Sequence, residues 1–170
     1  MDLPSGKEGS VGERWILPAA CLLAPLAAGA IGSVFTVSSV SGWYATIPKP
    51  AWTPPSFLFG PVWTLLYVLM GIAAFLVWRA RKARRAFSLG VFFAHLVVNA
   101  LWSLVFFGLH AVSWALLDIV VLWAMIMWLI VLFFPQSRRA GWLLVPYALW
   151  VTYAASLNIG IAFLQSSGVH

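Results

Sequence analysis

The chain has 170 residues, of which 63% are hydrophobic and only 8% are charged. Soluble domains carry about 25% charged residues, so this composition excludes an ordinary water-soluble globular protein. The net charge of +6 does not indicate nucleic-acid binding, because the basic residues concentrate in one loop. The single cysteine, Cys21, excludes an intramolecular disulfide and a cysteine cluster, and we expect no metal site.

Four long segments contain no Asp, Glu, Lys or Arg. They lie between Arg14 and Lys49, between Lys49 and Arg79, between Arg85 and Asp118, and after Arg139. Each exceeds the ~20 residues with which a helix crosses a bilayer. We therefore predict an all-α integral membrane protein, a single domain over residues 1–170. Its five transmembrane helices are expected near 15–40, 58–78, 86–108, 112–134 and 142–165.

The first predicted span carries a stripe of small residues, Ala20, Ala24, Ala28 and Gly32. Small residues four apart let helices approach closely in lipid. The stripe is compatible both with packing inside the bundle and with a dimer seam.

The segment at 42–57 separates the first two spans and is rich in proline. It holds Pro48, Pro50, Pro54 and Pro55 together with Trp52. Proline fixes φ and restricts the preceding residue, so this loop has few backbone conformations. We expect a stiff loop that lies as a lid over one end of the bundle.

The other connections contain most of the charge. The basic run RARKARR occupies 79–85, Gly108 to Ser113 form a short turn, and PQSRRAG at 135–141 is predicted to be a turn. With Lys7 and Arg14 added, nine Lys and Arg residues lie on one side of the membrane, against Lys49 alone on the other. The positive-inside rule then predicts basic loops and N-terminus in the cytoplasm and the C-terminus outside, if the membrane is a bacterial inner membrane.

Polar residues inside the spans fall at similar depths. At about 1.5 Å per residue from the end that carries loop 42–57, Asp118, Asn99, Asn158 and Tyr67 lie about 9 to 14 Å deep. Trp63, Trp102, Trp114, Ala154 and Leu157 fall in the same half. Helical spacing places Trp114, Asp118, Val121, Met125 and Trp128 on one stripe, Asn99, Trp102 and Phe106 on a second, and Trp150, Ala154, Leu157 and Ile161 on a third. We expect these stripes to face inward.

Two interpretations of these polar residues stay open. Asn99, Asp118 and Asn158 could cross-link helices by hydrogen bonds or could contact a ligand. A charged Asp118 in mid-bilayer would cost about 2.5–3.5 kcal/mol, so it needs a partner or a proton. Deep tryptophans could line a pocket, whereas those at span ends belong to the interfacial belt. His95 and His110 give little indication of haem ligation.

Four motifs together resemble the tryptophan-rich sensory protein / translocator protein (TspO/MBR) family, formerly called the peripheral benzodiazepine receptor. They are WYATIPKPAWTPPSFLFGPVWTLLYVLMGIAAFLVW (43–78), NALWSLVFFG (99–108), WALLD (114–118) and PYALWVTYAASLN (146–158). The likeness runs through all five spans in order. It implies a five-helix bundle, commonly a homodimer.

The resemblance also implies a ligand pocket under the first loop. Its expected ligands are porphyrins such as protoporphyrin IX and haem, and isoquinoline carboxamide or benzodiazepine drugs, with no cofactor required. The motifs carry the pocket onto Trp52, Phe57, Trp63, Asn99, Trp102, Trp114, Val121, Trp150, Ala154 and Leu157. Asp118 joins this set because of its depth.

The resulting hypothesis is a membrane receptor or sensor that regulates tetrapyrrole levels or a stress response. A transporter of porphyrins or other lipophilic molecules is an alternative, although five spans lack the repeated halves of secondary transporters. Light-dependent porphyrin breakdown through Trp52 and Trp63 is another. No Lys or Arg follows Tyr153, so the Tyr-then-Lys/Arg pattern associated with sterol binding is absent, which favours a bacterial-type member.

Overall fold

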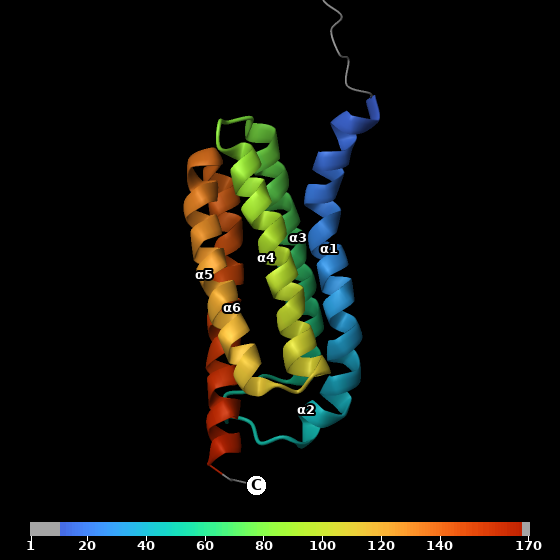
Figure 1. The fold of residues 1–170 in the computed structure, drawn as a ribbon, viewed down its shortest axis with the longest axis vertical. Coiled ribbons are helices and arrows are strands. Elements are labelled where there is room, and N and C mark those ends of the chain that lie inside the picture. Colours follow the sequence, from blue (N-terminus) through green and yellow to red (C-terminus); the bar gives the residue numbers. More distant parts are fainter. Residues whose placement is uncertain (1–10, 168–170) are drawn as a thin grey trace, which may run out of the picture.

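Five long helices dominate the computed structural model, which describes residues 11–167, with side chains from residue 15 onward (Figure 1). They are α1 (Val11–Ser41), α3 (Phe59–Ala80), α4 (Arg85–Ser103), α5 (Val112–Gln136) and α6 (Arg138–Ser166). All five are long and apolar enough to cross a membrane. The predicted all-α fold with five membrane-spanning helices is confirmed.

Three short elements lie between the long helices. A single helical turn, α2 (Trp43–Thr46), and a 3₁₀ turn, η1 (Ser56–Leu58), belong to the loop after α1. A π-helical turn, η2 (Leu104–Gly108), continues α4. Such π turns are often found at functional sites, and this one precedes His110, whose φ of 55° reverses the chain direction.

The connection between α5 and α6 is tighter than predicted. The expected turn over 135–141 is wrong, because only Ser137 separates the two helices. Its extended backbone breaks the helix, and its hydroxyl accepts a hydrogen bond of 3.4 Å from the Ala140 amide. Pro135 lies in the last turn of α5, and Gly141 packs against the Phe134 ring. Here a serine cap ends and restarts the helix.

The helices form a closed ring. Contacts connect α1 to α3, α3 to α6, α6 to α5, α5 to α4 and α4 back to α1. In Figure 1, α1 stands at one edge of the molecule and α5 and α6 at the other. The side chains of the ring interior form one apolar core that includes Met70, Phe92, Ile126 and Tyr147.

Small residues allow α1 to approach its neighbours closely. A Cβ on Gly29 would overlap the ring of Tyr67, and a Cβ on Gly71 would lie 3.1 Å from the Leu22 carbonyl oxygen. On the predicted small stripe, Ala28 and Gly32 are buried within the bundle. The stripe therefore packs, at least in that half, between helices of one chain.

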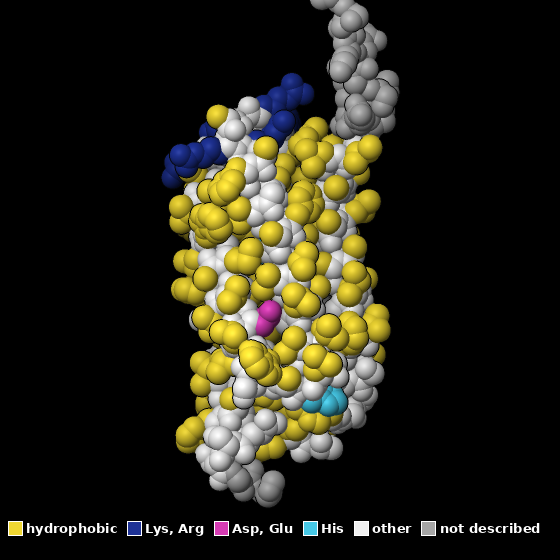
Figure 2. Space-filling model, in the orientation of Figure 1, with side chains coloured by type: hydrophobic (Ala, Val, Ile, Leu, Met, Phe, Trp, Pro, Cys, Tyr) yellow, Lys and Arg dark blue, Asp and Glu magenta, His cyan; other side chains and the backbone are white. Residues whose placement is uncertain are grey.

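Basic residues gather at one end of the bundle, as the dark blue side chains in Figure 2 show. They come from the α3–α4 connection, which includes Arg81 and Arg84, and from the start of α6. Lys49 lies in the loop at the opposite end. Lys7 lies outside the described residues, so the predicted place of the N-terminus is not addressed by the structure.

Gly29→Ala should destabilise the bundle, because the added methyl group must displace the Tyr67 ring. Overpacking of this kind costs about 1–3 kcal/mol. Gly90→Ala is the matched control, since a Cβ on Gly90 in α4 meets nothing within 4 Å. We expect thermal unfolding in detergent to show a lower midpoint for Gly29→Ala and an unchanged or higher one for Gly90→Ala. Equal midpoints would contradict the close α1–α3 contact.

Candidate functional site

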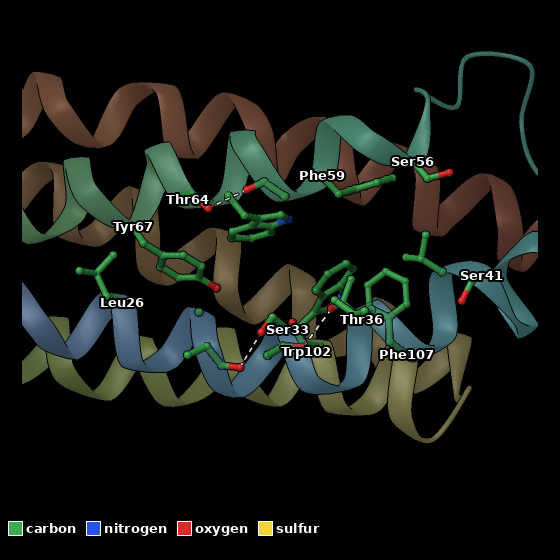
Figure 3. A pocket seen from close by; sticks show the side chains of 18 residues that line it. Leu26, Ser33, Thr36, Ser41, Ser56, Phe59, Thr64, Tyr67, Trp102 and Phe107 are labelled. Carbon is green, nitrogen blue, oxygen red and sulfur yellow. Dashed lines mark hydrogen bonds between the residues drawn. The ribbon is translucent and has the colours of Figure 1, made fainter.

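The main cavity lies between α1 and α3 at the end of the bundle that carries the proline-rich loop. Its volume is about 430 Å³, within the range of about 300–1,000 Å³ typical of small-molecule sites. Figure 3 shows it from close by, with side chains of α1, α3 and the α4–η2 segment pointing into it. The first predicted loop therefore does lie beside a cavity in the loop half of the bundle.

Aromatic side chains form two walls of this cavity. Phe59, Trp63 and Tyr67 come from α3, at a spacing of four that places them on one face of the helix. Trp63 stacks on Tyr67 with ring centroids 5.5 Å apart and planes 28° apart. Trp102 lies 6.5 Å from Trp63, and Phe107 of η2 completes the opposite wall. The cavity is thus lined by flat π surfaces.

The α1 wall is different because it presents hydroxyl groups. Ser33, Thr36 and Ser41 line the cavity from this helix. The Ser33 and Thr36 hydroxyls donate to the carbonyls of Ala30 and Gly32, at 2.7 and 3.0 Å, which satisfies their protons within the helix. Their oxygen lone pairs stay available as acceptors for a ligand.

A buried hydrogen-bonded chain holds the aromatic wall in place. The Tyr67 hydroxyl donates to Asn99 Oδ1 at 2.7 Å, and Asn99 Nδ2 donates to the Tyr147 hydroxyl at 2.9 Å. This chain joins α3, α4 and α6. Asn99 is 1% exposed and lies behind Tyr67, not among the residues that line the cavity.

Asn158 forms the second buried connection. Its Nδ2 donates to the Val112 carbonyl at 3.0 Å, and its Oδ1 accepts from the Trp102 indole at 3.4 Å. The amide thereby joins α6, α5 and α4, and it orients Trp102 at the cavity. Of the two interpretations left open above, the structure shows the cross-linking role for both Asn99 and Asn158.

The proline-rich loop lies across the end of the bundle and is fixed to α6 (Figure 1). The Tyr153 hydroxyl donates to the Trp52 carbonyl at 2.6 Å. Pro50 packs so closely on Gly160 that a Cβ at that glycine would overlap the proline ring. The loop is therefore held by α6, although it connects α1 to α3.

Lys49 fixes the loop internally. Its ammonium donates to the carbonyls of Tyr44, Ala45 and Ile47 at 2.7, 3.2 and 2.8 Å, and it lies 5.1 Å above the Tyr44 ring. Burial raises the pKa of Tyr44 to about 12, with a smaller contribution from Tyr153. The Tyr44 phenol therefore stays neutral at physiological pH, and the charge of Lys49 is used within the loop.

Two predicted site residues of the loop point outward. The side chain of Trp52 is 56% exposed and that of Phe57 is 74% exposed. Neither lines the main cavity, whereas Ser56 between them does. Only the Trp52 backbone is held, through its carbonyl. The structure thus places these two aromatic side chains at the rim of the bundle.

The prediction that Trp114, Asp118, Val121, Met125 and Trp128 face the bundle interior is wrong for this stripe. Trp114 is 70% exposed, and Val121 and Trp128 are also exposed. The buried stripe of α5 is instead Val112, Ala115, Ile119, Leu122, Ile126 and Leu129. Every face of this helix is apolar, so hydrophobic spacing alone could not separate the lipid face from the core face. Trp114, Asp118 and Val121 line a different groove, between α4 and α5.

The other two predicted stripes do face inward. Asn99, Trp102 and Phe106 are all buried, and on α6 so are Ala154, Leu157 and Ile161. Trp150 is partly buried and lies 6.2 Å from the Phe59 ring, behind the cavity wall. Trp150, Ala154 and Leu157 do not line the main cavity themselves. Of the predicted site residues, the cavity brings together Trp63 and Trp102.

Several cavity residues were missed by sequence reasoning. They are the α1 residues that include Gly29, Ser33 and Thr36, together with Phe107 on η2. One signal was present, since 29, 33 and 36 follow the spacing i, i+4, i+7 and alternate small and hydroxyl side chains. The position of Phe107 depends on the π turn, for which the sequence carries no clear signal.

The histidines lie away from the cavity. His95 is fully buried, and its Nδ1 donates to the Phe92 carbonyl at 2.6 Å. His110 is exposed and stacks on Trp43 with ring centroids 4.3 Å apart. Neither lines the main cavity.

The fold and cavity define a class: a small multi-pass membrane protein with a tryptophan-lined cavity between its first helices, beside a stiff loop. The chain belongs to the TspO/MBR family, whose model matches residues 21–164. The resemblance noted in the sequence is thereby confirmed.

Relatives from distant organisms match nearly the whole chain. A tryptophan-rich protein TspO from Archaeoglobus fulgidus is 42% identical over 147 residues, covering 86% of this chain and 95% of the relative. Protein CrtK from Rhodobacter capsulatus is 38% identical, covering 79% and 83%. The human translocator protein is 33% identical, covering 85% and 87%.

Asn99→Leu should destabilise the protein strongly, because it leaves the buried hydroxyls of Tyr67 and Tyr147 without partners. Each unpaired buried group costs about 1–3 kcal/mol. Adding Tyr67→Phe and Tyr147→Phe to the same variant removes those hydroxyls, so the triple variant should regain part of the loss. Reversible unfolding in mixed detergent measures both. A triple variant that is less stable than Asn99→Leu would contradict this account.

Proposed function

We propose that this protein is a membrane receptor or sensor that binds a planar tetrapyrrole, such as protoporphyrin IX or haem, in the cavity between α1 and α3. The observation that supports this most directly is the aromatic lining. Trp63, Tyr67 and Trp102 present ring faces within one space of about 430 Å³. Large flat apolar rings gain from both burial and offset stacking against such walls.

The polarity of the cavity also suits this ligand class. A porphyrin has an apolar macrocycle with its carboxylates along one edge. Ser41 and Ser56 line the loop end of the cavity, as Figure 3 shows. The carboxylate edge would lie there, near the membrane surface, and the macrocycle would lie deeper, between Trp63 and Trp102. Isoquinoline carboxamides and benzodiazepines, which are also flat and apolar, would use the same walls.

The stiff loop supports ligand binding by its fixed position. Lys49 and Tyr153 hold it at the end of the bundle through four hydrogen bonds to backbone carbonyls. A cavity whose rim is already ordered loses less entropy when a ligand binds. We place the basic end of the bundle in the cytoplasm, so the cavity would open toward the opposite face. A homodimer is a further proposal, supported by the family resemblance.

Ala30→Phe should weaken protoporphyrin IX binding by about tenfold or more, because Ala30 lines the cavity and the added ring would occupy it. The control is Ala19→Phe, an exposed position on the same helix that does not line the cavity. A fluorescence-quenching titration in the dark, with purified protein in detergent, measures both. Wild type and Ala19→Phe should saturate in the micromolar range or tighter.

Trp63→Ala should also lose affinity in this titration, since it removes the central ring of the stack. Circular dichroism checks that each variant keeps its helices. Equal saturable binding by wild type, Ala30→Phe and Trp63→Ala would place the porphyrin elsewhere. Absence of saturable quenching by the wild type would reject the tetrapyrrole proposal.

Light-dependent breakdown of the bound porphyrin is a second candidate, favoured by the contact between Trp63 and Tyr67. An excited porphyrin beside stacked indole and phenol rings has oxidisable neighbours. We expect illumination of the saturated complex in air to bleach porphyrin faster than free porphyrin in the same detergent. Trp63→Phe should slow the bleaching, whereas Trp52→Phe should not, because Trp52 does not line the cavity. Equal rates with and without protein would leave a receptor only.

A further inference from the structure

Asp118 is the one acidic residue between residues 15 and 167, and it lies on the lipid-facing side of α5. In Figure 2 an acidic side chain, drawn in magenta, is surrounded by hydrophobic side chains at mid-height of the bundle. Its Oδ2 atom is buried and has no hydrogen-bond partner among the described residues. Asn99 and Asn158, at comparable depth, have both amide atoms paired.

A groove surrounds this carboxyl group. It has a volume of about 400 Å³ and is lined from α4, η2 and α5 by Val98, Val105, Leu109, Ala111, Trp114, Leu117, Asp118 and Val121. Every lining side chain except Asp118 is apolar. The groove lies between α4 and α5 and shares no lining residue with the main cavity.

We propose that this groove binds a lipophilic amine, whose nitrogen pairs with the Asp118 carboxyl group while its apolar body lies against Trp114 and Val121. Charge complementarity selects this class of ligand. A neutral lipophile would leave the carboxyl group unpaired, and an anion would be repelled by it. An amine provides N–H donors to the carboxylate, and a charge-assisted hydrogen bond is stronger in a site without water.

The proton balance of the pair is closed by its two members. An amine that arrives neutral through the lipid takes the proton of a protonated carboxyl group, and an ammonium ion pairs with a carboxylate that is already ionised. Both routes end with one ammonium and one carboxylate in the groove. The exposed indole of Trp114, one helical turn from Asp118, adds a π surface for the cation.

The test uses 2-(4-bromophenyl)ethylamine, because its bromine quenches a nearby indole, and 2-(4-bromophenyl)ethanol as the neutral probe of the same shape. The wild-type protein in detergent should show a saturable quenching component with the amine that is absent in Trp114→Phe. Asp118→Asn, which keeps the side-chain shape, should weaken amine binding by about tenfold or more, because a charge-assisted hydrogen bond is lost. The alcohol should bind both proteins equally.

A second variant keeps the carboxyl group but fills the groove. Val121→Phe should also weaken amine binding, whereas Val131→Phe, at an exposed position of α5 that does not line the groove, should not. Equal quenching of wild type and Asp118→Asn by the amine would show partitioning into the detergent only and would overturn the proposal. Loss of a dimer in Asp118→Asn, without saturable amine binding by the wild type, would show that a second copy covers the groove, and would also overturn it.

Discussion

The pairing of polar groups within the membrane is the constraint on which the rest of this structure depends. Lipid offers no hydrogen bonds, so each buried amide and hydroxyl group must find a partner in the protein. Asn99 meets this requirement by joining Tyr67 and Tyr147, and Asn158 meets it by joining Trp102 and the Val112 carbonyl. These bonds fix four of the five helices relative to one another.

The same bonds place the cavity walls. Tyr67 is held from behind by Asn99, and Trp63 stacks on the Tyr67 ring. Trp102 is oriented by Asn158 on the other side. The cavity can stay open because its aromatic lining is supported by an outer layer of hydrogen bonds. A binding site of this kind needs no polar residue of its own at mid-membrane, which is why the two asparagines act behind its walls.

The fold was predictable from the sequence for a simple reason: charge is so costly in lipid that charged residues mark the ends of the spans. The site was only partly predictable. Trp63 and Trp102 line the cavity as expected, but the stripe of α5 through Trp114 and Val121 faces outward. In a soluble helix the polar face would identify the surface. In this helix both faces are apolar, and the rotation of the helix is set by packing that its own sequence does not encode.

The two kinds of polar residue in the spans differ in a way that sequence depth could not reveal. The asparagine side chains combine donors with an acceptor, so one amide can join two helices and be fully satisfied inside the bundle. A carboxyl group in the same interior would need either a cation or a proton, and among the described residues the spans offer no Lys or Arg at that depth. Asp118 lies instead at the lipid-facing edge of α4 and α5, where a partner can arrive from the membrane. The contrast separates internal cross-links, which stabilise the cavity, from a side chain whose partner is not part of the bundle that the structure describes.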